Sequence, residues 1–318
     1  MRALSLVGLL LFSSVLALAQ EEHQRIPVFT TDVEMVSVAI AVHDRDGNFV
    51  RGLTADQFKV YEDGVEQRIE LFAAGLDESW VDLPPEIKDK LSGRQVIGLI
   101  MDASGSMEDD MPLLRTAAIK FLMNIPKTEN LFVMDFDENI RLSRYSSDDQ
   151  RVIAERIYGI KSEGWTALYD AAATFLERVY DLDGRKTLVI FSDGVDSRST
   201  LGVGEVFEMV KLSNVTMHSI HFAGSSSMSR RFQESRFLRQ LARETGGTYA
   251  QGHSLEVIDE LFDKVLDELF SQYNIAYLSS NMETNGKYRK IKIEVDLDDI
   301  KIRHRRGYFG PEREPTKQ

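Results

Sequence analysis

Apolar residues near the start of the chain follow a strand-like pattern. Between about Val33 and Phe72 they alternate with smaller or polar residues, and Asp46-Gly47 and Asp63-Gly64 separate the runs. A period of two with Asp-Gly turns is typical of antiparallel strands. Roughly forty residues make three or four strands, whereas a sandwich usually has about seven. We therefore expect this segment to pair with strands from elsewhere in the chain.

Such strands are predicted near the other end. Tyr273–Leu278 is apolar, Asn285-Gly286 is typical of a type I′ hairpin turn, and apolar residues then alternate with charged ones from Ile291 to Leu297 and onward to Tyr308. The two ends are therefore predicted to form one β-sandwich, with the middle of the chain inserted into it.

The middle of the chain alternates buried strands with amphipathic helices. This order predicts an α/β fold, a doubly wound, mostly parallel, Rossmann-like sheet covered on both faces. The expected strands are Val96–Met101, Leu131–Phe136, Thr187–Phe191 and Val215–Phe222. The expected helices are Met111–Ile125, Asp148–Ile157, Leu168–Tyr180, Val206–Leu212, Phe232–Glu244 and Ser254–Ser271.

The first twenty residues differ from the rest. Arg2 precedes an apolar run from Leu4 to Leu16, and Ala17-Leu18-Ala19 fits a small-x-small cleavage site. The run is shorter than the roughly 18–20 residues that span a membrane, and no later segment is long enough either. We predict a secretory signal peptide cut after Ala19, and therefore a secreted or periplasmic protein, although a retained membrane anchor is the alternative.

These patterns set the expected domain boundaries. They are a signal peptide over 1–19, sandwich strands over 20–77, a linker over 78–93 with Pro84-Pro85, the α/β domain over 94–271, completing sandwich strands over 272–310, and a tail over 311–318.

Composition removes several kinds of chemistry. Among the 318 residues there is no cysteine, which excludes disulfides, thiolate metal sites and a cysteine nucleophile. The 38 Lys and Arg against 51 Asp and Glu give a formal net charge of −13. A nucleic-acid binder would show a basic face, so the balance favours cations and other partners that tolerate negative charge.

Oxygen-bearing residues follow the expected strands of the α/β domain. Asp102, Ser104 and Ser106 come after the first strand, Thr166 precedes the helix Leu168–Tyr180, and Asp193 comes after the third strand. In a doubly wound sheet the carboxyl ends of the strands hold the ligand. Carboxylate and hydroxyl oxygens suit a hard divalent cation, so the sequence predicts a Mg²⁺ or Mn²⁺ site.

This order of residues resembles the metal-ion-dependent adhesion site of von Willebrand factor type A (VWA) domains. There the pattern is Asp-x-Ser-x-Ser, then a Thr, then an Asp, and all five positions match within roughly Arg94 to Phe270. The signal peptide and the phrases Gly52-Leu53-Thr54-Ala55-Asp56-Gln57-Phe58 and Arg306-Gly307-Tyr308 are similar to bacterial VWFA-related secreted proteins.

The resemblance implies a function in protein binding. In such domains the metal keeps an open position that an Asp or Glu of a partner protein fills, and no reaction is catalysed. It also implies that the C-terminal helix, here Ser254–Ser271, moves when ligand binds. That helix runs almost directly into the strand Tyr273–Leu278, so the connection either transmits a shift or only fixes orientation.

Other readings stay open. Asp102 and the two serines suit a helix cap, and a structural subunit whose metal only stiffens the site is a third possible function. The rival enzyme class is a metal-dependent phosphoesterase that resembles haloacid-dehalogenase phosphatases, with Asp135 and Asp137 as its motif. Asn139 departs from that motif, where Thr or Val belongs.

Three further features are predicted to have structural roles rather than to bind a ligand. Asp44-x-Asp46-Gly47 favours a turn over a calcium loop. His218 and His221 lie three apart on a strand and point to opposite faces, which argues against a shared metal. The basic run Arg303–Arg306 is typical of a solvated strand face.

Overall fold

The computed structural model describes residues 35–75, 95–222, 228–252 and 254–312. All of them belong to one unit that begins at Val33. The predicted signal peptide, the predicted linker and residues 313–318 of the tail lie outside the described residues. Among the described helices, none combines the length and the apolar character needed to cross a membrane.

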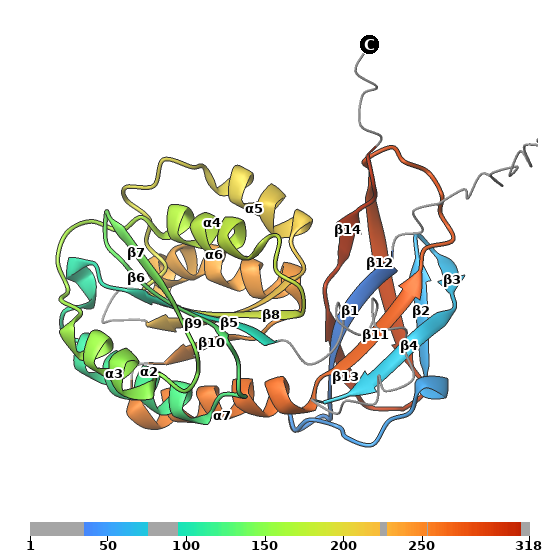
Figure 1. The fold of residues 1–318 in the computed structure, drawn as a ribbon, viewed down its shortest axis with the longest axis horizontal. Helices are drawn as coiled ribbons and strands as arrows, with labels where there is room; N and C mark the ends of the chain where they lie inside the picture. The colour runs from blue at the N-terminus through green and yellow to red at the C-terminus, as the bar shows by residue number, and fades with distance from the viewer. Residues whose placement is uncertain (1–34, 76–94, 223–227, 253, 313–318) are drawn as a thin grey trace, which may run out of the picture. The chain divides into compact units, whose positions relative to one another are not determined.

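The middle of the chain forms a sheet of six strands in the order β10-β9-β8-β5-β6-β7 (Figure 1). All neighbouring pairs are parallel except β6 and β7. The strands are β5 (Gln95–Asp102), β6 (Asn130–Phe136), β7 (Ile140–Tyr145), β8 (Arg185–Ser192), β9 (Val215–Phe222) and β10 (Tyr249–Gly252). The predicted α/β class, doubly wound and mostly parallel, is confirmed.

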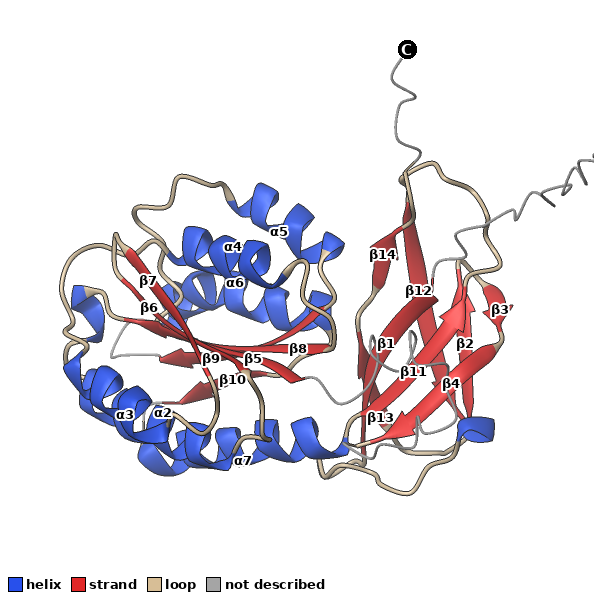
Figure 2. Ribbon diagram, in the orientation of Figure 1, coloured by secondary structure: helices blue, strands red, loops and turns tan. Residues whose placement is uncertain are grey.

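Helices cover both faces of this sheet (Figure 2). One face packs against α2 (Met111–Asn124), α3 (Gln150–Gly159) and α7 (Leu255–Ser271). The other packs against α4 (Leu168–Val179), α5 (Val203–Leu212) and α6 (Met228–Thr245). Strand β5 serves both layers, since Ile97 and Leu99 join the first core and Val96 and Ile100 the second. This explains why the strand reads as an uninterrupted apolar run.

Two strands of this sheet were not predicted. In β7, Ile140 and Leu142 are half-buried and pack against the α4–α6 core, while Arg141 lies between them and is exposed. Strand β10 has only four residues and is the outermost strand beside β9. Both are edge strands, where burial on one face only weakens the apolar signal.

Strands from both ends of the chain form two four-stranded sheets, in the orders β13-β1-β11-β4 and β14-β12-β2-β3. Their shared apolar core includes Val38, Val60, Ile275 and Ile293, as expected of a β-sandwich. The strands are β1 (Met35–His43), β2 (Phe58–Glu62), β3 (Val65–Gln67), β4 (Ile69–Ala74), β11 (Tyr273–Leu278), β12 (Tyr288–Val295), β13 (Lys301–His304) and β14 (Gly307–Phe309).

The predicted turns have different outcomes. Asp63-Gly64 joins β2 to β3, with positive φ at both residues, as the pattern indicates. The prediction of a hairpin at Asn285-Gly286 is wrong. Strand β11 lies in one sheet and β12 in the other, so the loop between them crosses the sandwich and Asn285 instead bridges Glu312.

A buried polar cluster lies inside the sandwich. The hydroxyls of Tyr277 and Tyr308 donate to Glu62 Oε2, at 2.9 and 2.8 Å, and Ser279 donates to Glu62 Oε1 at 2.6 Å. Arg289 lies 3.5 Å from the same carboxylate. The tyrosine of the Arg306-Gly307-Tyr308 phrase therefore satisfies a buried acid, which is a structural role.

Candidate metal centre

The predicted residues meet where the chain reverses its direction of travel through the sheet. From β5 the chain proceeds outward to β6 and β7, and it then returns to β8 on the other side of β5. Met101 pairs with Phe191, so Asp102 and Ser192 are the next residues along these neighbouring strands. Such a switch point leaves a crevice at the carboxyl ends of the strands, where ligands bind in doubly wound folds.

The turn after β5 brings the first three oxygens together. Asp102 Oδ1 accepts hydrogen bonds from the Ser104 backbone N–H at 3.0 Å and from its hydroxyl at 2.6 Å. The hydroxyl oxygens of Ser104 and Ser106 are 3.1 Å apart. Asp102 and Ser104 are buried, and Ser106 is exposed. The group therefore opens to solvent at Ser106.

The loop before α4 is fastened to this turn through its backbone. Glu163 N–H donates to Ala103 O at 2.9 Å, and Gly105 N–H donates to Gly164 O at 3.1 Å. Gly164 has φ of +77°, and a Cβ there would clash with the carboxylate of Glu138, so only glycine suits this position. These contacts fix the backbone two residues before Thr166, whose side chain is 5% exposed, against the serine turn.

The loop after β8 contains Asp193 and is hydrogen-bonded to Thr166. Asp193 is half-buried, and its Oδ1 accepts the Val195 N–H at 3.0 Å. Thr166 O accepts the backbone N–H groups of Ser197 and Arg198, each at 2.9 Å. All five predicted residues therefore lie at one edge, on three loops that are hydrogen-bonded to one another.

Sequence reasoning missed several residues that support this edge. Ser192 donates to Asp102 Oδ2 at 2.6 Å, and His221 Nε2 lies 2.8 Å from Asp193 O. Ser199 and Asp196 accept the Tyr169 N–H at the start of α4. The parallel pairing of β5 with β8 is the signal that would have identified Ser192.

The electrostatics of the edge favour a cation. Burial, with Asp193 close by, raises the pKa of Asp102 to about 7. Among the described residues, the groups around the Asp102 carboxylate are the hydroxyls of Ser104 and Ser192 and the second carboxylate, Asp193. The described residues contain no group of three or more His, Asp or Glu side chains that could hold a metal. Carboxylates alone therefore do not make up a ligand set here, and the nearest further oxygens are the hydroxyls of Ser104 and Ser106, which lie 3.1 Å apart.

The helix-cap interpretation fits the structure less well. Helix α2 begins at Met111 and its N-cap is Asp110, eight residues after Asp102. A short 3-10 turn, Gly105–Met107, lies between, and its N-cap Ser104 makes no side-chain capping bond. Asp102 and the serines therefore bond with one another and with Ser192.

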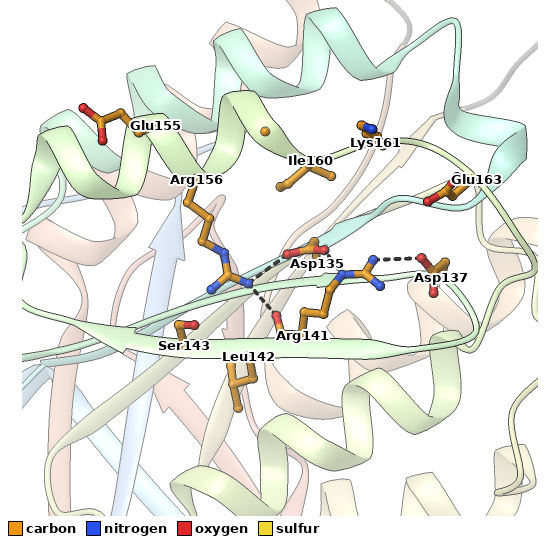
Figure 3. A pocket seen from close by; sticks show the side chains of 11 residues that line it. Asp135, Asp137, Arg141, Leu142, Ser143, Glu155, Arg156, Ile160, Lys161 and Glu163 are labelled. Atoms are coloured by element: carbon orange, nitrogen blue, oxygen red, sulfur yellow. Dashed lines mark hydrogen bonds and ion pairs between the residues drawn. The ribbon is translucent and has the colours of Figure 1, made fainter.

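The carboxylates proposed for the phosphoesterase reading are held in ion pairs (Figure 3). Asp135 contacts Arg141 Nε through Oδ2 and Arg156 Nη2 through Oδ1, the latter at 2.8 Å. Asp137 contacts Arg141 Nη2 at 2.9 Å, and although burial opposes it, this bond with that from Asn139 lowers the pKa of Asp137. These groups line a cavity of about 600 Å³ with Lys161 and Glu163. With both carboxylates paired to guanidinium groups, the geometry disfavours a nucleophile here.

The remaining candidates have local partners. Asp44 accepts the Asn48 N–H at 2.8 Å and closes a turn. His218 Nδ1 accepts the Thr248 N–H, and His221 lies against Tyr249 and Asp193, so the two buried histidines bond to different groups. Arg303 is not merely solvated, because it donates to Glu268 of α7 at 2.5 Å.

No protein-family model matches the chain. Calcium-activated chloride channel regulator 3A-1 of the mouse is 27% identical over 176 residues, which cover 52% of this chain. The match spans only 18% of that relative's length.

Several solved structures are similar in fold. A von Willebrand factor type A protein from Catenulispora acidiphila has 12% identity and a TM-score of 0.47, covering 91% of this chain and 76% of that one. The proximal thread matrix protein 1 of the mussel byssus, with a zinc-occupied MIDAS motif, has 14% identity and a TM-score of 0.46, covering 65% and 49%. The chain is similar to these VWA-domain proteins. Its six-stranded sheet is the doubly wound sheet that the alternation of strands and helices predicted.

Proposed function

We propose that the protein is an exported, metal-dependent protein-binding module of the adhesion type. A Mg²⁺ or Mn²⁺ ion would be held by Asp102, Ser104, Ser106, Thr166 and Asp193. The observation that carries this proposal is a buried carboxylate, Asp102, which faces a second carboxylate and hydroxyl groups but no basic side chain among the described residues. A divalent cation would stabilise this arrangement.

The chemistry of the donor set indicates what such an ion would bind. Three of the five donors are neutral hydroxyls, so the ion would keep much of its positive charge. Ser106 is exposed and Asp193 half-exposed, so a ligand from outside can approach. An anionic oxygen from an Asp or Glu of a partner protein suits that position best. Binding, rather than turnover, is the proposed activity.

Export is proposed from the sequence. The charged start, the short apolar run and the Ala17-Leu18-Ala19 site are typical of a signal peptide, which would place the mature protein in the periplasm or outside the cell.

Calorimetry with Mg²⁺ and with Mn²⁺ on the mature chain tests metal binding. We expect one site per chain, lost in Asp102→Ala and in Thr166→Ala. The control is Asp148→Ala, which removes an exposed carboxylate at the start of α3. Equal metal affinity in wild type and Asp102→Ala would overturn the proposal.

The carboxylate step needs a separate measurement. Binding of Glu-containing peptides should require Mg²⁺, vanish in chelator and fail with Ser104→Ala. Peptides in which Gln replaces Glu should not bind. Binding that is indifferent to the metal and to this replacement would show that the contact surface lies elsewhere.

A further inference from the structure

A large aromatic side chain stands in solvent beside the candidate metal centre. Trp165 immediately precedes Thr166 and is 64% exposed. Tryptophan is buried in most positions because its ring removes 150–250 Å² of surface from water. Exposed tryptophans of this kind are enriched among the residues that dominate binding at protein interfaces.

The backbone at Trp165 is held in place. Its N–H donates to Glu138 Oε2 at 2.5 Å, and the Ala167 N–H donates to Asp137 O at 2.9 Å. Gly164 on its other side is bonded to Gly105 of the serine turn. A ring on a fixed backbone loses little further freedom when a partner covers it, which favours affinity.

The charges around the ring restrict the partner. Glu138, whose carboxylate accepts the Trp165 N–H, and Glu163, two residues before Trp165, are both exposed. A partner segment with a run of acidic residues would be repelled here, although one carboxylate is required at the metal. The fitting segment therefore has one isolated acidic residue with an apolar neighbour.

We infer that Trp165 is a specificity-determining contact of the metal-dependent interface. A protein partner places its Asp or Glu on the metal and packs an adjacent large apolar side chain, such as Leu or Phe, on the Trp165 ring. This inference rests on the proposed function, and it adds the class of sequence that the site selects.

Selection from a displayed random-peptide library, in Mg²⁺ and in chelator, tests the inference on the mature chain. Wild type should enrich an isolated Asp or Glu with a large apolar neighbour, in Mg²⁺ only. Trp165→Ser should still enrich the acidic residue but lose the apolar preference. Trp165→Phe should keep part of it.

The affinity of the selected peptides gives the second readout. Trp165→Ala should weaken binding at least about thirtyfold, the range of an interface hot spot. The matched control is Tyr180→Ala, an aromatic residue 68% exposed at the far end of α4, which should change affinity less than twofold. Calorimetric Mg²⁺ affinity should be the same in Trp165→Ala as in wild type.

The outcomes separate the two proposals. Acidic, Mg²⁺-dependent peptides with no apolar preference, or with the same preference on Trp165→Ser, would overturn the role of Trp165 and leave the metal function standing. If wild type selected no Mg²⁺-dependent acidic peptide while the Mg²⁺ titration still showed a bound ion, the carboxylate step of the proposed function would fail, and the inference with it.

Discussion

Two pairs of carboxylates stand at the ends of neighbouring strands and are compensated in different ways. Asp135 at the end of β6 is 5% exposed and contacts two guanidinium groups. Asp102 at the end of β5 is fully buried and, within the described part of the chain, accepts hydrogen bonds only from Ser104 and Ser192. The protein supplies its own cations at β6 and hydroxyls at β5. The comparison teaches that an acidic pair indicates a metal only where the chain leaves its charge uncompensated.

The largest effect is expected when the ion pairs of Asp135 at the end of β6 are broken. Asp135→Asn leaves Arg156, which is 19% exposed, without its anionic partner, so we expect the free energy of unfolding to fall by about 3 kcal/mol. Chemical denaturation followed by Trp165 fluorescence in a Trp80→Phe background measures it. Asp148→Asn, an exposed change, is the control and should have no effect. An unchanged midpoint in Asp135→Asn would show that the ion pairs contribute nothing.

His218 is a third buried ionisable group, and unlike Asp135 and Asp102 it is accommodated by staying neutral. Burial lowers the pKa of His218 to about 4 from its usual 6.5. Below pH 6.5 the unfolded chain therefore binds a proton that the folded chain rejects, and stability falls as the pH drops from 6.5 toward 4. We expect a loss of about 2 kcal/mol between pH 7.5 and 5 from this residue.

The variant His218→Asn isolates that contribution. Its amide oxygen can still accept from Thr248 N–H, but it does not titrate. The stability of the variant should fall less steeply with acid than that of wild type. Parallel pH profiles for the two proteins would assign the acid sensitivity to other groups.

A smaller effect is expected where a hydroxyl supports Asp102. Ser192→Ala removes the donor to Asp102 Oδ2, so the carboxylate loses one of the bonds that orient it toward the edge. We expect Mg²⁺ affinity to weaken about five- to tenfold, or about 1–1.5 kcal/mol. Calorimetry beside Ser146→Ala, a change on the loop before α3, checks it. A Ser192→Ala affinity equal to that of this control would remove Ser192 from the account.

The strong periodic segments of the fold were predictable from the sequence. Strand β9 has the predicted bounds, and α4 differs from its prediction by one residue at its end. Strands β7 and β10 were missed because an edge strand buries only part of its surface. The Asn285-Gly286 hairpin failed for a different reason, since the local turn signal does not say which sheet the next strand joins.

The candidate site was predictable as far as residue type and strand end determine it. The proposed ligand set rests on the positions of Asp102, Thr166 and Asp193 just after or before regular elements. Ser192 and Glu138 were not found, because their roles depend on which strands are neighbours and on how a loop folds back. The sequence does not distinguish Trp165 from other loop residues, because the exposure of its side chain depends on the fold.

The most direct test of the central claim measures the stability of wild type and Asp102→Asn in chelator and in Mg²⁺. Without metal, the variant no longer buries a charge beside Asp193, so it should be at least as stable as wild type. Saturating Mg²⁺, at about 100 times Kd, should stabilise wild type by about 3 kcal/mol and leave the variant unchanged. Equal stabilisation of both proteins by Mg²⁺, or of neither, would contradict a metal centre at Asp102.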